Sequence, residues 1–178
     1  IPSDSWRDAA DEDSAPTDRL ALGVEVASDL AWASVALSGR RADGSWPVAP
    51  EACQDTPGAG VAWLVPYLSA LVTANPPIRS LVVDVAGPVK SMLEQRGGAG
   101  NAQWYFAGTK VRVSAIRVAD LGATCSTLLS GVVTREVRHM DQKQLNTAAL
   151  AAGKRPLGDT GMWVWSRRTA TSDITPIQ

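Results

Sequence analysis

The run Ser80-Leu-Val-Val-Asp-Val85 constrains the fold most, because its aliphatic residues follow one another without polar alternation. Such a run is typical of a strand buried on both faces, as in a parallel sheet covered by helices. Asp84 stands inside it. An ionised carboxylate among aliphatic neighbours is costly unless it is paired or binds a metal, so Asp84 is a candidate functional residue. The alternative is that Asp84 has no function and only lies at the solvent-exposed end of the strand.

The segments around this run predict a mixed α/β sheet. Residues 19–26, 31–38 and 45–49 have strand character and are joined by short turns, which predicts antiparallel hairpins. Residues 61–72 have amphipathic helical spacing, and Pro66 predicts a kink or a late start. The other expected elements are helix 88–96, strand 110–118, helices 120–135 and 142–152, strand 162–165 and a helix start, cut off, from residue 171. The order β-β-β-α-β-α-β-α-α-β therefore predicts five or six strands with helices on both faces.

Length and charge indicate one domain that follows an acidic N-terminal segment. The chain has 178 residues, within the range of a single domain, and without an initial Met it looks like a piece of a longer protein. Residues 1–18 hold six acids and one base without apolar periodicity, so we expect a flexible linker there and a folded domain over 19–178. We expect no signal peptide and no membrane span. Residues 19–178 hold 16 bases and 12 acids, which permits contact with nucleic acid without requiring it.

The candidate chemistry is that of carboxylates. With one His and two isolated Cys, zinc binding and a Cys-His nucleophile are improbable, and no phosphate loop of the Gly-Lys-Ser/Thr type occurs. Glu25, in Leu22-Gly-Val-Glu-Val26, is a second acid in an apolar strand. If the strands of Glu25 and Asp84 are neighbours, their oxygens suit Mg²⁺ or Mn²⁺, and two such ions can promote phosphodiester cleavage.

An acid on the first strand and another on the fourth resembles the ribonuclease-H-like fold. The sequence is also similar to the nuclease domain of large terminase subunits of tailed bacteriophages, of the kind found in phages of actinobacteria. The matching segments are 22–29 with 32–34, 82–88, His139 with 144–145, 158–159 through 163–167, and 172–176. They cover the chain from about Leu20 to its end.

The resemblance implies that Glu25, Asp84 and Asp173 bind two divalent ions, Mg²⁺ or Mn²⁺. Glu25 and Asp84 would bind the first ion and Asp173 the second. The family usually has Asp where this chain has Glu25, and Glu reaches one methylene further. Asp29 and Asp159 are possible substitute acids, although both also fit plain turns.

Basic residues near the matching segments are expected to contact DNA phosphates. They are Arg135, Arg138, His139, Lys143, Arg167 and Arg168. The alternative is that these basic side chains only form part of the solvated protein surface.

The function implied by the resemblance is cleavage of concatemeric double-stranded DNA during viral packaging, in the cytoplasm of the host cell. The implied partners are DNA, an upstream ATPase domain of the same polypeptide, the portal and the small terminase subunit. Two alternatives stay open: another ribonuclease-H-like nuclease, of the resolvase or integrase type, and a non-catalytic docking domain of the packaging motor. Cleavage of plain linear duplex favours the terminase, and failure to bind Mn²⁺ favours the docking domain.

Overall fold

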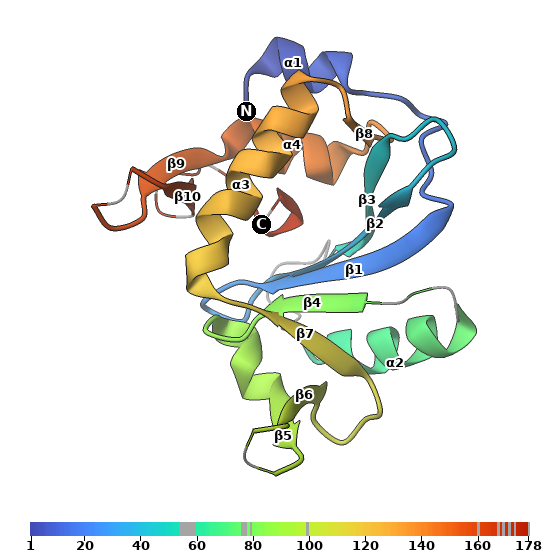
Figure 1. Ribbon diagram of the computed structural model, residues 1–178, viewed down its shortest axis with the longest axis vertical. Helices are drawn as coiled ribbons and strands as arrows, with labels where there is room; N and C mark the ends of the chain where they lie inside the picture. Colours follow the sequence, from blue (N-terminus) through green and yellow to red (C-terminus); the bar gives the residue numbers. More distant parts are fainter. Residues whose placement is uncertain are drawn as a thin grey trace.

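The central element of the structure is a mixed β-sheet. The computed structural model describes residues 1–53, 60–75, 78, 80–98, 100–159, 161–166, 168, 170, 172 and 174–177. The strands of the sheet are β1 (Asp18–Val26), β2 (Ala33–Arg40), β3 (Trp46–Cys53), β4 (Ser80–Asp84), β5 (Leu93–Arg96), β6 (Gln103–Phe106), β7 (Arg112–Ile116) and β8 (Val137–His139). Within the described ranges these eight strands lie in the order β5-β6-β7-β4-β1-β2-β3-β8 (Figure 1).

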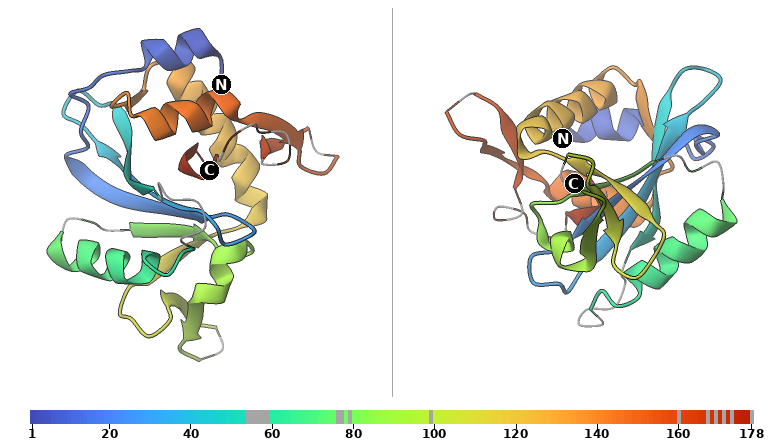
Figure 2. Two further views of the ribbon diagram at one scale, coloured as in Figure 1. Left: turned by 180° about the vertical axis from the view of Figure 1, so that it is seen from behind. Right: turned by 60° about the horizontal axis from the view of Figure 1, so that its bottom comes forward.

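Helices cover both faces of this sheet, as expected (Figures 1 and 2). The helical segments are α1 (Ser3–Asp8), α2 (Leu64–Ala74), α3 (Val118–Val133), α4 (Lys143–Ala151) and the 3₁₀ turns η1 (Pro88–Met92) and η3 (Thr175–Ile177). α2 packs on one face, whereas α3 and α4 lie on the other. A two-stranded hairpin of β9 (Gly153–Pro156) and β10 (Trp163–Ser166) extends beside α3. Among the described helices, none has the length and apolar character needed to cross a membrane.

The strand directions agree with the sequence-based expectation. β1 pairs with β2, and β2 with β3, in antiparallel hairpins, whereas β1 and β4 are parallel. Because side chains alternate along a strand, Leu22, Val24 and Val26 of β1 all point into the core under α2. Glu25 therefore points to the opposite face. The predicted late start of the helix is also confirmed, since α2 begins at Leu64 and Pro66 lies in its first turn.

A short 3₁₀ turn and the strand β5 replace the helix expected over residues 88–96. Pro88 starts only the short turn η1, after which Leu93–Arg96 pair antiparallel with Gln103–Phe106. Gly97 and Gly100, with φ of +105° and +93°, allow the chain to turn between them. Strand pairing has overridden the local helical pattern here. With β5, β6 and β8 added, and with the expected strand 162–165 paired to β9 in a separate sheet, the described part of the main sheet has eight strands rather than five or six.

The N-terminal segment is not the flexible linker that its composition predicted. It forms α1, and Trp6 is only 4% exposed in a core cluster with residues of α3, α4 and β10. The indole ring stacks on His139, with ring centroids 4.0 Å apart, and its Nε1 donates a hydrogen bond to Asn146 Oδ1 at 2.8 Å. Trp6 therefore anchors the segment, together with the buried Ala9 and the backbone hydrogen bond from the Asp11 N–H to the His139 carbonyl at 2.8 Å.

Candidate active site

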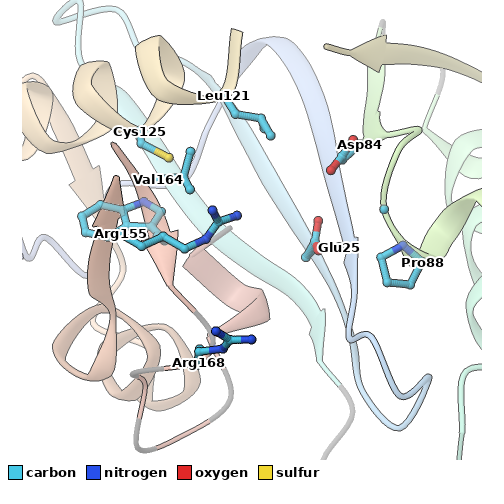
Figure 3. A pocket seen from close by; sticks show the side chains of 10 residues that line it. Glu25, Asp84, Pro88, Leu121, Cys125, Arg155, Val164 and Arg168 are labelled. Atoms are coloured by element: carbon cyan, nitrogen blue, oxygen red, sulfur yellow. The ribbon is translucent and has the colours of Figure 1, made fainter. Parts of the chain in front are cut away.

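Glu25 and Asp84 lie side by side at the ends of two neighbouring strands. The parallel register of β1 and β4 places Val24 opposite Val83, so the next residue of each strand is an acid at the same level. Both carboxylates lie on the face away from α2, and both residues are half-buried. Figure 3 shows the two carboxyl groups pointing toward each other. The sheet therefore brings together the two acids that the sequence singled out.

A tight turn after β4 fixes the carboxylate of Asp84. The Ala86 backbone N–H donates a hydrogen bond to Asp84 Oδ1 at 2.9 Å, and the Gly87 N–H donates to the Asp84 carbonyl at 3.0 Å. A Cβ atom at Gly87 would lie 3.3 Å from Asp84 Oδ2. Glycine at this position leaves that oxygen accessible, whereas a larger residue would crowd it.

The two acids form one wall of a pocket of about 520 Å³. Its lining residues come from β1, from β4 and the segment after it, from α3, from the β9–β10 hairpin and from position 168. They are Glu25, Asp84, Gly87, Pro88, Leu121, Cys125, Arg155, Val164, Trp165 and Arg168. The guanidinium groups of Arg155 and Arg168 point across the pocket toward the acids (Figure 3). The site thus combines two carboxylates with two guanidinium groups on opposite walls.

Cys125 belongs to the less polar part of this wall. It is a free, half-buried thiol on α3, and burial raises the pKa of the Cys125 thiol above its usual value. The protonated thiol is therefore favoured, and this form is a poor nucleophile. The side chain of Cys53 lies outside the described residues.

The third expected acid, Asp173, lies outside the described residues, as does Arg167. Residues 174–177 are buried: Ile174 is 1% exposed, and the Thr175 hydroxyl lies 2.6 Å from that of Ser34. Ser34 is the β2 residue paired with Glu25. In the part of the chain that the structure describes, no group of three or more His, Cys, Asp or Glu residues suited to a metal is found.

The two substitute acids lie in exposed turns and not in the pocket. Asp29 Oδ1 accepts a hydrogen bond from the Ala31 N–H at 3.0 Å, which is a turn-forming contact. Asp159 lies in the turn that connects β9 and β10. For both residues, the structure favours a role in forming a turn over a role as a substitute metal ligand.

His139 does not fit the expected phosphate contact. Its ring is 1% exposed, its Nε2 lies 2.8 Å from the Trp6 carbonyl oxygen, and its Nδ1 accepts a hydrogen bond from the Asp141 N–H. The ring is thus occupied in holding α1 against the domain. Arg135 forms an ion pair with Asp8 at 2.6 Å, and Arg138 donates to the Asp8 carbonyl, so both also contact the N-terminal segment.

None of these three residues lines the pocket, and neither does the exposed Lys143. Phosphate contact by Arg135, Arg138 and Lys143 stays a prediction. Arg155, in contrast, lines the pocket and was missed by the sequence analysis. Its only signal there was a basic Lys-Arg pair next to Pro156, in a strand too short to show alternation.

A mixed sheet with acids on its first and fourth strands, in a pocket between that sheet and a helical layer, defines a fold of the ribonuclease-H-like class. No protein-family model matches the sequence, and no curated protein matches it. Among solved structures, the chain is similar to the HK97 bacteriophage large terminase, with a TM-score of 0.76 and 16% identity. The match covers 99% of this chain and 41% of that terminase, so the chain spans about two fifths of its length. The predicted resemblance is confirmed at the level of the fold.

Proposed function

We propose that this chain is the metal-dependent endonuclease domain of a viral large terminase, which cuts concatemeric double-stranded DNA. The observation that carries the proposal is the convergence of the Glu25 and Asp84 carboxylates from neighbouring parallel strands in a pocket with a cationic opposite wall. The fold shared with a phage large terminase supports it. An upstream ATPase domain, the portal and the small terminase subunit would be partners, in the cytoplasm of the host cell.

The acid pair fits divalent metal ions. Carboxylate oxygens are ligands that Mg²⁺ and Mn²⁺ prefer, and Gly87 leaves Asp84 Oδ2 accessible from the pocket. Glu25 and Asp84 would hold the first ion, and Asp173, assigned from the sequence resemblance, the second. When bound, two such ions supply the charge that activates water and stabilises the leaving oxygen in phosphodiester cleavage.

The basic residues of the opposite wall would bind DNA through its phosphates. Arg168 points into the pocket toward the acids, and Arg167 precedes it in the sequence. A guanidinium group can form two parallel hydrogen bonds to one phosphate, which fixes the position of the backbone as well as binding it. Arg168 would therefore hold the strand against the acids, while Glu25 and Asp84 provide the reactive centre.

Cleavage of supercoiled and linear plasmid in Mn²⁺, Mg²⁺ or EDTA tests this proposal. Asp84→Asn keeps an oxygen for the turn hydrogen bond but removes the charge, so we expect at least a ~100-fold loss of cutting. Asp43→Asn is the matched control, since Asp43 accepts the same kind of turn hydrogen bond, from the Ser45 N–H at 2.9 Å, in an exposed turn. It should cut like the wild type.

The metal series adds a second expectation. Because Glu25 replaces the usual Asp, we expect stronger cutting in Mn²⁺, which tolerates imperfect geometry better, than in Mg²⁺, and none in EDTA. Cutting that persists in EDTA, or that is equal in Asp84→Asn, contradicts the proposal. A folded wild type that neither cuts nor binds Mn²⁺ in a calorimetric titration would instead be a docking domain. A preference for branched junctions over linear duplex would indicate a resolvase.

A further inference from the structure

The β9–β10 hairpin presents different side chains to its two sides. Arg155 of β9 pairs with Val164 of β10, and both line the pocket. The neighbouring residue Lys154 instead places its Nζ 4.0 Å from the centre of the Trp163 ring. Trp163 also packs edge-to-face on Trp165, which is 3% exposed in the core. The aromatic pair therefore anchors the hairpin to the core, with Trp165 also reaching the pocket wall, and Arg155 lies opposite Val164 on the strand pair that faces the pocket.

The charge of Arg155 is not compensated by the residues that the structure describes. The ion pairs found among those residues include neither Arg155 nor Arg168. Both guanidinium groups nevertheless point into the same pocket, toward two half-buried carboxylates on the other wall. An anion that enters between the walls gains charge-assisted hydrogen bonds from the arginines. The same anion is repelled by the acids unless cations lie between them.

We propose that Arg155 is a phosphate-binding residue of this site, which holds the phosphodiester group of the DNA strand from the hairpin side. The inference rests on the proposed nuclease function and adds to it a residue, and an element, that the sequence resemblance did not assign. The ligand class is a phosphodiester, because a planar guanidinium fork matches its paired oxygens. Arg155 thus positions the strand on the wall opposite Glu25 and Asp84, and the hairpin acts as its rigid support.

The test compares Arg155→Met with Lys154→Met in the full chain. The two variants lose the same charge from adjacent positions of one exposed strand, but only Arg155 lines the pocket. Binding of a fluorescent DNA duplex is measured by anisotropy in Ca²⁺ over a series of salt concentrations, with a gel to verify that the duplex stays intact. For Arg155→Met we expect an about tenfold higher Kd and a salt slope reduced by about 0.9. Lys154→Met should bind like the wild type.

Three further readouts separate phosphate binding from a structural role. Mn²⁺ affinity and tryptophan fluorescence should be unchanged in Arg155→Met, because Trp163 and Trp165 report on the packing of the hairpin. Cleavage in Mn²⁺ should show a raised KM. Arg155→Lys should recover part of the affinity, since lysine restores the charge but not the fork.

Equal weakening by both methionine variants, or an Arg155→Met protein with wild-type Kd and KM, overturns the proposal for Arg155. The nuclease proposal survives that result as long as the wild type cuts and Asp84→Asn does not. A wild-type chain that neither binds nor cuts DNA overturns both.

Discussion

Burial determines the acid–base behaviour of Cys125, although its thiol lines an open pocket. Because the thiolate is penalised by desolvation, the folded protein holds the thiol proton to higher pH than the unfolded chain. Above the usual pKa of a thiol, the unfolded state therefore ionises first, and this residue contributes less stability as the pH rises. The consequence is a cysteine of low reactivity next to the candidate reactive centre.

Alkylation measures this directly. We predict that iodoacetamide modifies Cys125 in the folded protein at pH 8 several times more slowly than in the urea-unfolded chain, since the thiolate is the reactive form. The rate in the folded protein should rise with pH and reach its midpoint above the ordinary thiol value. Peptide-resolved mass spectrometry distinguishes Cys125 from Cys53. Equal rates in the two states would contradict the prediction.

Single residues were predictable from the sequence where their strand context was unusual. Glu25 and Asp84 interrupt aliphatic strands, and that conflict between charge and burial is visible without a structure. Arg155 had no such signal, because its place in the pocket depends on how the β9–β10 hairpin packs against the rest of the domain. The role of His139 depends on Trp6, which is distant in sequence, so its surroundings gave no indication of the contact.

At the scale of elements, α3 and β8 approach each other closely at a glycine. A Cβ atom at Gly131 of α3 would lie 2.6 Å from Cγ2 of Val137 in β8. Val137 has a short, branched side chain that has little freedom to move aside. Glycine therefore fits the last turn of this helix better than alanine, which helix propensity alone would favour.

We predict that Gly131→Ala lowers the free energy of unfolding by about 1 kcal/mol. Overpacking of a core costs about 1–3 kcal/mol, which outweighs the gain of about 1 kcal/mol from the helix propensity of alanine. Urea unfolding measures the change, and a double-mutant cycle with Val137→Ala identifies its cause. The loss should largely disappear in the double variant when it is compared with Val137→Ala. A single variant at least as stable as the wild type would refute the steric argument.

Elements were predictable in proportion to their length. The long, periodic helices and the central strands were located to within a few residues, since hydrophobic spacing defines them. β8 and β9 were missed because three or four residues are too few to display a period. β5 and β6 were missed because antiparallel pairing, and not local propensity, decides their conformation.

At the scale of the whole molecule, α1 is part of the domain. Trp6 is buried among residues from α3, α4 and β10, and Asp11 forms an ion pair with Arg41 at 2.9 Å, in the turn between β2 and β3. The acidic composition of the segment predicted a flexible linker and did not reveal this anchoring. Composition averages over a segment, whereas packing depends on particular residues such as Trp6.

Truncation of the anchor tests this conclusion. We predict that Trp6→Ala lowers the free energy of unfolding by about 3–5 kcal/mol, as expected for loss of a buried aromatic residue. Trp46→Ala is the matched control, because Trp46 is 41% exposed and its loss should cost about 1 kcal/mol or less. Both are measured by urea unfolding. A Trp6→Ala protein as stable as the control variant would show that the segment is a linker after all.

The parallel pairing of β1 with β4 also determines when the acid pair comes into existence during folding. β1, β2 and β3 pair through short turns, so their contacts are local and form quickly. The chain runs through β2, β3 and α2 between β1 and β4. The pairing of β1 with β4 is therefore a long-range contact, which forms slowly. A chain that has formed only its early hairpins has Glu25 and Asp84 far apart. The two acids therefore meet only when β4 joins the sheet, and under the proposed function the site for cleavage would be assembled late in folding.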